Sequence, residues 1–350
     1  MTNQTTLLGG TPGRTIPNFG HPLWRRILVN REAAVILAAV LVYVVSCITV
    51  PYFSGTLTVD YLLLDATPIL MIALPMTLII VTGEIDLSVA STLALSNVLL
   101  GVLTQAKVPI VLAMILCLVA GILAGMLNGF LVTIVGLPSL AVTIGTLALI
   151  RGIAVGLLGT TAITNFPQFW LDLSQAQFGT SGIPVVMVLV VVLIVIFAIL
   201  LHFTPFGRGL FAIGLSKETA AFSGIKVNRT KFIAFMLSGF VSAIAGLFWT
   251  FRYGTAQGDN ATGLELSVIA AVLLGGVSIF GGKGALPGVI GGVLLIGVLT
   301  SALQLASVSS SVISIITGAL LVVSVLYPRI LAWAARRRAK PPTQVNKEAS

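Results

Sequence analysis

Residues 184–203 read PVVMVLVVVLIVIFAILLHF and contain no Asp, Glu, Lys or Arg. A hydrophobic run of this length matches the roughly 20 residues that an α-helix needs to cross a bilayer. Similar runs recur from Ala33 to Pro328, separated by short breaks that are polar or contain Gly and Pro. The sequence therefore predicts that lipid surrounds most of the chain.

The composition points the same way. The chain has 350 residues, of which 57% are hydrophobic and only 8% are charged, whereas roughly a quarter of the residues in a soluble domain are charged. A net charge of +9 would suggest a nucleic-acid partner if the Lys and Arg residues formed one patch on a soluble domain. They lie between the apolar runs instead, so we expect an all-α integral membrane protein and no nucleic-acid partner.

Hydropathy predicts about ten transmembrane helices. They lie near residues 33–52, 61–82, 88–104, 109–134, 138–158, 184–203, 231–251, 265–280, 285–304 and 311–327. With the N-terminus in the cytoplasm, most of the 19 Lys and Arg residues fall in cytoplasmic segments. Because cytoplasmic loops are enriched in Lys and Arg, this distribution predicts an even number of helices and two cytoplasmic termini.

This topology divides the chain into three parts. A cytoplasmic tail at 1–32 precedes a membrane domain at 33–327, and a basic cytoplasmic tail follows at 328–350. The membrane domain includes a long cytoplasmic loop at 204–231. The first 32 residues do not resemble a cleaved signal peptide, which has a shorter apolar core near its start, so we expect the first helix to be retained.

Two sets of glycines recur at every fourth residue. In lipid, small residues on one face of a helix let two backbones approach closely. The spacing predicts helix-packing surfaces, and a role in a pathway or a hinge is the alternative. The two sets are Gly121, Gly125 and Gly129, and Gly284, Gly288 and Gly292.

The glycine-rich segment 275–284 does not match either nucleotide-binding motif. A P-loop needs Gly where Val277 stands and Ser or Thr where Gly284 stands. The dinucleotide motif would need a small residue at Pro287. We therefore expect no nucleotide to bind to this chain.

Residues that could form a metal site or a catalytic centre are scarce. The chain has two histidines, His21 and His202, which cannot form a known metal-binding spacing. Cys47 and Cys117 both lie in apolar runs, where free cysteines are usually inert. We expect no catalytic residue, no metal and no cofactor.

Ionisable residues within membrane segments are candidates for a functional site. Glu84 and Asp86 lie near an inner helix end, where Asp86 or Ser88 could cap the next helix. Arg151 lies well into its span towards the outer face, where it either lines a pathway or extends to the headgroups. Glu265 lies near an outer helix end. These four charged residues are the candidates for a pathway or a gate.

The loop at 204–231 is longer than a helix connection requires. Within it, Ser216 is a suitable N-cap and Gly224 a suitable stop for a short helix. Ala221 and Phe222 would then be apolar residues in an aqueous loop, which favours contact with a partner protein. A helix lying on the lipid headgroups is the alternative.

Three stretches resemble the sugar-type ABC permeases that serve ribose, xylose, rhamnose and autoinducer 2. They are LPMTLIIVTGEIDLSV at 74–89, TGLELSVIAAVLLGGVS at 262–278 with GGKG at 281–284, and SGIKVNR at 223–229. The second stretch is the most specific, and the resemblance extends from about Arg31 to Tyr327.

The resemblance implies a protein of the bacterial inner membrane with several partners. In that family two permeases pair, receive sugar from a periplasmic binding protein and are driven by separate ABC ATPase subunits. Family members often have a neutral residue where Glu84 stands, so this carboxylate serves either solute recognition or local capping. The resemblance also implies a coupling helix that docks on the ATPase, formed by Lys217, Glu218, Thr219, Ala220, Ala221, Phe222, Ser223, Gly224 and Ile225.

The expected function is that of a permease subunit rather than an enzyme. It would move a monosaccharide or a related small polar solute by alternating access. The alternative is a self-sufficient secondary carrier or channel, which should carry coupling-ion groups near the middle of the membrane. No acidic residue in this sequence is clearly placed there.

Overall fold

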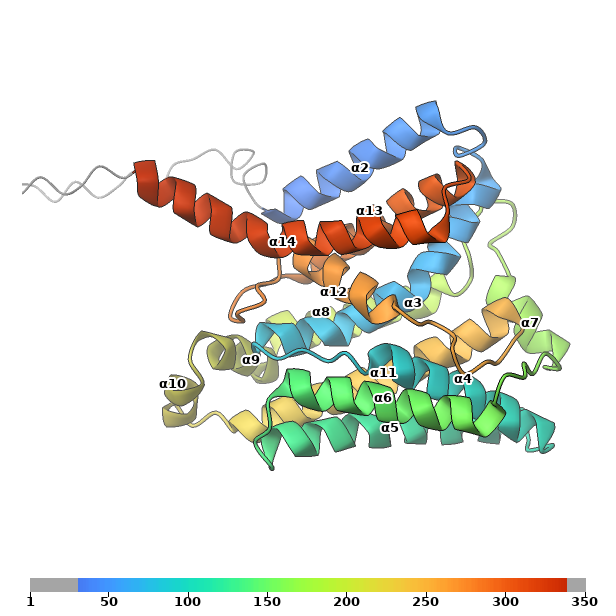
Figure 1. Ribbon diagram of the computed structural model, residues 1–350, viewed down its shortest axis with the longest axis horizontal. Coiled ribbons are helices and arrows are strands. Elements are labelled where there is room, and N and C mark those ends of the chain that lie inside the picture. The colour runs from blue at the N-terminus through green and yellow to red at the C-terminus, as the bar shows by residue number, and fades with distance from the viewer. Residues whose placement is uncertain (1–30, 339–350) are drawn as a thin grey trace, which may run out of the picture.

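The structure, a computed structural model, describes residues 31–338 (Figure 1). Predictions about residues 1–30 and 339–350, which include most of both tails, lie outside the described residues. The described part of the chain consists of helices and two isolated β-bridges. The predicted all-α class is confirmed.

The helices follow one another with short connections. Their bounds are α2 (Arg31–Thr49), α3 (Thr56–Val81), α4 (Val89–Gln105), α5 (Ile110–Thr133), α6 (Ser139–Leu158), α7 (Gln168–Gln175), α8 (Met187–Phe203), α9 (Pro205–Leu215), α10 (Lys217–Phe222), α11 (Val227–Tyr253), α12 (Leu264–Leu274), α13 (Leu286–Leu305) and α14 (Ser310–Arg338).

Six helices in the described range are long and apolar enough to cross a membrane: α2, α3, α5, α6, α11 and α13. A seventh span is formed if α8 and α9, which meet at an angle of 64°, count as one. Shorter apolar helices are α4, α12 and residues 310–326 of α14. An integral membrane fold is therefore confirmed, whereas the count of ten spans, the orientation of the termini and the three-part division of the chain stay predictions.

Three features differ from the sequence-based expectation. The helix predicted at 265–280 ends at Leu274, because the glycine-rich segment that follows leaves the helix with Gly276 at a φ of 91°. Helices α7 and α9 occupy segments that were expected to be loops. The short helix predicted after Ser216 is present as α10, and the Ser216 hydroxyl accepts a hydrogen bond from the Thr219 N–H group at 3.2 Å.

Helix α3 lies at the centre of the bundle (Figure 1). In its most apolar 18-residue window 89% of the residues are buried, compared with 28% for α5 and α6 and 11% for α2. Its neighbours include α8, α11, α12 and α13. The apolar residues of α3 therefore face protein, whereas those of α2, α5 and α6 largely face outwards.

The two halves of the bundle repeat one arrangement in opposite directions. In the first half, the long helix α3 leads through an extended linker at 82–88 into the shorter α4, followed by α5 and α6. In the second half, α11 leads through a linker at 254–263 into α12, followed by α13 and α14. Figure 1 shows α3 antiparallel to α11, and α13 antiparallel to α5. Inverted repeats of this kind are common in transporters, but here the two halves show no convincing sequence similarity.

The glycines of α5 lie against α11. A Cβ atom added at Gly121 would lie 2.6 Å from the carbonyl oxygen of Gly239, and one at Gly125 would lie 2.4 Å from that of Phe235. Gly129 is slightly less crowded, with the Phe232 carbonyl oxygen at 3.2 Å. The two backbones are thus in direct contact along this surface, as expected of small residues in membrane helices.

The second glycine set lies at the contact between α12 and α13. Added Cβ atoms at Gly288 and Gly292 would lie 2.1 Å from the carbonyl oxygens of Gly275 and Ala271. Gly284 precedes the first turn of α13 and contacts the side chain of Val277 instead. Only two of these three glycines therefore lie within a helix.

We expect Gly239→Ala to destabilise the fold. The added methyl group would lie 2.1 Å from the Gly121 carbonyl oxygen and 2.9 Å from the Gly125 Cα atom, so two backbones must separate, at a cost of about 1–3 kcal/mol. The matched control is Gly145→Ala on α6, where no atom lies within 4 Å. Thermal unfolding of the detergent-solubilised protein should show a lower midpoint for Gly239→Ala only. Equal midpoints for the two variants would contradict direct backbone contact.

Candidate functional site

The linker at 82–88 carries a buried carboxylate. Asp86 is 1% exposed, and its Oδ1 atom accepts hydrogen bonds from the Ser88 N–H group at 3.0 Å and the Ser88 hydroxyl at 2.7 Å. Its Oδ2 atom accepts from the Ser238 hydroxyl of α11 at 2.8 Å. The Asn128 side-chain amide of α5 donates to Ser88 Oγ at 2.7 Å. Asp86 therefore joins the linker to α11 directly and to α5 through Ser88.

This geometry corrects the capping expectation. Ser88 occupies the N-cap position of α4, but its side chain makes no capping hydrogen bond. Asp86 accepts from the Ser88 N–H group, which precedes the helix, rather than from a donor in the first turn of α4. Neither side chain is thus an N-cap in the usual sense. Asp86 holds the linker itself.

Helix α6 satisfies the backbone of the same linker. The Ile85 N–H group donates to the Ser139 hydroxyl oxygen at 3.2 Å, and the Thr143 hydroxyl donates to the Ile85 carbonyl at 3.3 Å. An extended segment has no partner strand here, so these side chains replace the hydrogen bonds that a helix would supply.

Glu84 forms an ion pair with Lys231 near the start of α11. Lys231 is 6% exposed, and the Glu84 side chain is 20% exposed. Glu84 was expected to serve solute recognition or capping, and the structure gives it a different partner. Since α11 begins five residues after α10 ends, the ion pair connects the base of the 204–231 loop to the linker at 82–88.

The helices of the 204–231 loop differ in their exposure. In α10, Ala220 is buried and packs in a small cluster with Ile213 and Val227, whereas Ala221 is exposed and Phe222 is 93% exposed. The exposed residues Lys217, Glu218, Thr219, Ser223 and Gly224 and the half-buried Ile225 complete the predicted coupling segment. The loop thus has a packed side and a free side.

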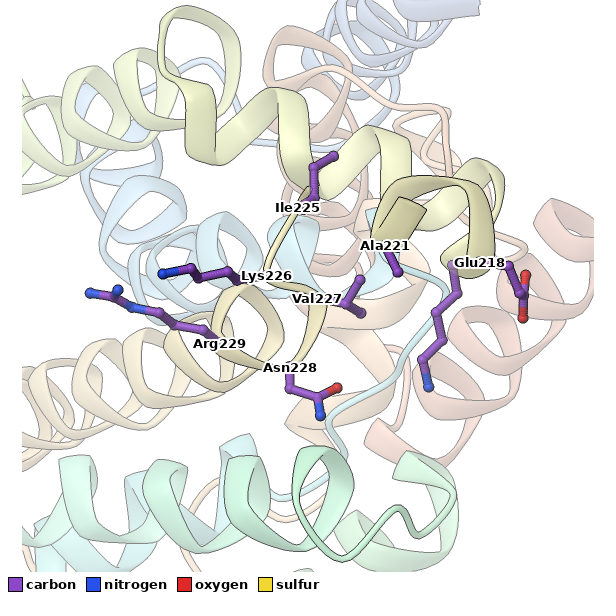
Figure 2. Close-up of a pocket in the computed structure, with 8 residues that line it drawn as sticks. Glu218, Ala221, Ile225, Lys226, Val227, Asn228 and Arg229 are labelled. Carbon is purple, nitrogen blue, oxygen red and sulfur yellow. The ribbon is translucent and has the colours of Figure 1, made fainter. Parts of the chain in front are cut away.

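A cavity of about 530 Å³ lies between α10 and the first turn of α11 (Figure 2). Glu218 and Ala221 line it from α10, and Asn228 and Arg229 line it from α11. Figure 2 shows Lys226 and Arg229 pointing to one side, away from Glu218. The free side of the loop therefore presents a hollow with Lys226 and Arg229 at one edge and the neighbouring Lys217 and Glu218 of α10 at another.

Helix α9 contacts the end of α3 at backbone distance. A Cβ atom at Gly214 would lie 1.9 Å from the Val81 carbonyl oxygen and 2.3 Å from the Gly282 N atom. The Gly282 N–H group itself donates to that Val81 carbonyl at 2.8 Å. The glycine-rich segment 275–284 thus forms a three-way junction with α3 and α9.

The other two charged candidates lie towards the opposite end of the bundle. The Arg151 Nη1 atom donates to the carbonyl oxygens of Gly258 at 3.0 Å and Asn260 at 2.6 Å. Arg151 therefore holds the linker at 254–263 rather than extending to headgroups. Glu265 lies in the first turn of α12, close enough to interact electrostatically with Arg151.

Asn97 of α4 holds the same linker from the other side. Its side-chain amide donates to the Thr250 hydroxyl at 2.8 Å and the Thr255 carbonyl at 2.9 Å. Its carbonyl oxygen accepts from the Gln257 N–H group at 2.9 Å and the Asn260 amide at 3.1 Å. Every hydrogen-bonding position of this fully buried amide is thus occupied.

The structure therefore separates the four predicted residues into two places. Glu84 and Asp86 lie together in the linker at 82–88, and Arg151 and Glu265 lie together near the linker at 254–263. The side chains that hold these residues or their linkers in place were not predicted from the sequence. An available signal was the presence of amides inside apolar runs, since polar side chains in membrane helices are costly unless they have a role. The missed residues are Asn97, Asn128, Lys231 and Ser238.

Within the described range, no group of three His, Cys, Asp or Glu side chains is arranged to hold a metal ion.

We expect the Glu84–Lys231 ion pair to affect the stability of the fold because it is largely buried. Glu84→Gln or Lys231→Met alone leaves a charge with no opposite partner, at a cost of about 2–4 kcal/mol, whereas the double variant leaves none and should recover most of the stability. Lys226→Met, at an exposed position, is the control. Thermal unfolding in detergent checks this. The prediction would be contradicted if the double variant had an unfolding midpoint no higher than that of the less stable single variant.

Comparisons with known proteins agree with this geometry. The family described as "Branched-chain amino acid transport system / permease component" matches residues 58–325. The autoinducer 2 import system permease protein LsrD of Escherichia coli O157:H7 is 38% identical over 284 residues, which cover 77% of this chain and 86% of that protein. LsrD of Salmonella paratyphi B is 35% identical over 281 residues, covering 77% and 84%. No solved structure matches the chain.

The family match includes every described span except α2, as well as both linkers and the 204–231 loop. The resemblance to sugar-type ABC permeases is thereby confirmed, and with it a place in the bacterial inner membrane. The chain belongs to this permease family and is a membrane-embedded permease subunit of an ABC importer, in which partner subunits hydrolyse ATP.

Proposed function

We propose that this chain moves a small, neutral, hydroxylated solute into the cell as one of two paired permeases. Separate ATPase subunits would drive it, and a periplasmic binding protein would deliver the solute. Because the LsrD relatives are named for import of autoinducer 2, that compound is the first candidate, with sugars close to it. The observation that carries the proposal is the exposed helix α10, which is connected to the linker at 82–88 through packed and ionic contacts.

Helix α10 has the features of a docking element. Its buried Ala220 fixes it to the bundle, whereas Phe222 is 93% exposed. The neighbouring Ala221 lines the hollow together with Lys226 and Arg229 (Figure 2). Apolar side chains at a partner's surface gain energy when a pocket buries them, and aromatic anchors often dominate such interfaces. We therefore assign the segment 217–225 to ATPase docking.

Two connections would carry a displacement of α10 into the membrane. The first runs from α9 through Gly214 to the end of α3 and the glycine-rich segment. The second runs from α11 through Lys231 to Glu84, and from there along the linker to Asp86. Because α3 is the central helix, movement of its end would affect helices on several sides of it. This arrangement supports alternating access driven from the cytoplasmic side.

A self-sufficient carrier is less well supported. Such a carrier needs groups that can take up and release a coupling ion during transport. Of the two acidic residues in the linker at 82–88, Glu84 is engaged by Lys231, and Asp86 accepts three hydrogen bonds. Both are committed to holding the linker.

We expect Phe222→Ala to weaken docking of the ATPase while leaving the permease folded. Loss of a buried aromatic anchor costs on the order of 2 kcal/mol, or roughly thirtyfold in affinity. Phe169→Ala, at an aromatic residue 67% exposed in α7, is the matched control. Co-purification with the cognate ATPase and uptake of labelled autoinducer 2 should fall for the first variant only. Wild-type co-purification and uptake in Phe222→Ala would contradict the coupling role.

The orientation predicted from the basic residues can be tested separately. In a background without Cys47 and Cys117, a cysteine at Gln175 should react with an impermeant thiol reagent applied to intact spheroplasts, and a cysteine at Thr219 should not. Permeabilised cells should label both, because both positions are exposed. Labelling of position 219 but not 175 in intact spheroplasts would reverse the topology.

A further inference from the structure

A crevice of about 420 Å³ opens between α3, α12, α13 and α14. It lies where α3 begins, α13 ends and α14 begins, which is the periplasmic half of the membrane under the proposed topology. Apolar residues such as Leu62 and Ile296 form part of the wall. The wall also includes six hydroxyl or amide side chains, those of Ser267, Thr300, Ser301, Gln304, Ser314 and Thr317.

Two of these hydroxyls are satisfied by their own helix. Ser314 donates to the Ser310 carbonyl and Thr317 to the Ile313 carbonyl, both at 3.0 Å. The same local bond is made by Thr77, Thr133 and Thr250 in other helices. It is the usual way for Ser and Thr to be accommodated in a helix within lipid.

The other four polar side chains have no hydrogen-bond partner among the described residues. They are Ser267 of α12 and Thr300, Ser301 and Gln304 of α13, and all four line the crevice. Ser267, Thr300 and Ser301 are half-buried. Polar groups in such a position are costly unless water or a ligand bonds to them. Three hydroxyls and an amide thus remain available to an occupant.

The charge of the crevice also limits what it would hold. Asp65 is the charged residue among the described residues that line it. Its Oδ1 atom lies 3.5 Å from Arg252 Nη2 and accepts a hydrogen bond from the Tyr253 hydroxyl at 3.3 Å. The carboxylate is therefore already matched by a cation. A ligand with many neutral donors and acceptors fits this wall better than an ion.

We propose that this crevice binds a neutral polyhydroxylated solute, through Ser267, Thr300, Ser301 and Gln304. The solute class rests on the proposed function, and the crevice would be a station for the transported compound on the periplasmic side. An acyl chain of a lipid, the other conceivable occupant, would leave all four polar side chains without partners.

The test uses cysteine protection and needs neither ATP nor transport. Ser301→Cys, in the background without Cys47 and Cys117, is labelled with a small impermeant thiol reagent in right-side-out membrane vesicles. We expect labelling in buffer, and labelling at least about threefold slower in high D-ribose, a neutral polyol probe. Ribose 5-phosphate should protect less, because no Lys or Arg among the described residues lines the crevice to compensate the desolvation of its phosphate. Gln175→Cys, outside the crevice, should be labelled equally with and without ribose.

Two isosteric substitutions separate the free hydroxyls from the satisfied ones. In the Ser301→Cys protein, Thr300→Val should raise the ribose concentration for half-protection about fivefold, the value of one hydrogen bond. Thr317→Val removes a hydroxyl whose proton is donated to its own helix, and it should change the ribose concentration for half-protection less than about twofold.

The proposal is overturned if Ser301→Cys resists labelling, if ribose gives no protection, or if Gln175→Cys is protected equally. Equal effects of Thr300→Val and Thr317→Val would also overturn it. Since the readout is occupancy of the crevice, a failure of ATP-driven uptake would count against the proposed function and leave this result standing.

Discussion

The fold depends on supplying hydrogen bonds to backbone that leaves the helices inside a largely apolar bundle. An N–H or C=O group that is buried without a partner destabilises a protein, so such a segment persists only where other protein groups replace the lost helical bonds. The linkers at 82–88 and 254–263 are such segments. Ser139 and Thr143 bond to the first linker, and Asn97 and Arg151 bond to the second. These polar side chains set where α4 and α12 begin.

The two linkers are held by different chemistry at opposite ends of the bundle. The linker at 82–88 depends on anions, since Asp86 collects hydroxyl donors and Glu84 binds Lys231. The linker at 254–263 depends on an arginine and an amide that reach backbone carbonyls. The first linker lies beside the helices proposed to contact the ATPase, and the second lies beside α12, which borders the crevice. The two linkers therefore occupy corresponding places in the two halves of the bundle but have different partners.

The sequence was informative wherever the signal was local. Apolar runs predicted the positions of the principal helices, and Ser216 with Gly224 predicted α10, because hydropathy and capping act within a few residues. The helix expected at 265–280 was too long, since hydropathy does not register that the glycines after Leu274 leave the helix. The Glu84–Lys231 pair joins residues 147 apart in sequence, and no local pattern distinguishes Lys231 from the other basic residues of the 204–231 loop. Long-range partners leave no local pattern, whereas Asn97 and Asn128 are amides in apolar runs, a local signal from which they could have been predicted.

The central position of α3 has a consequence for how the protein is made. In the finished fold α3 is enclosed by protein, yet it is about as apolar as α6, which largely faces outwards. Its neighbour α13 begins at Leu286, roughly 200 residues after α3 ends at Val81, which corresponds to roughly 10–40 s of translation at 5–20 residues per second. During that interval α3 must reside in the bilayer without the helices that later surround it. The hydrophobicity of α3 thus allows it to remain in lipid after it leaves the translocon. Protein contacts replace the lipid around α3 at a late step of assembly.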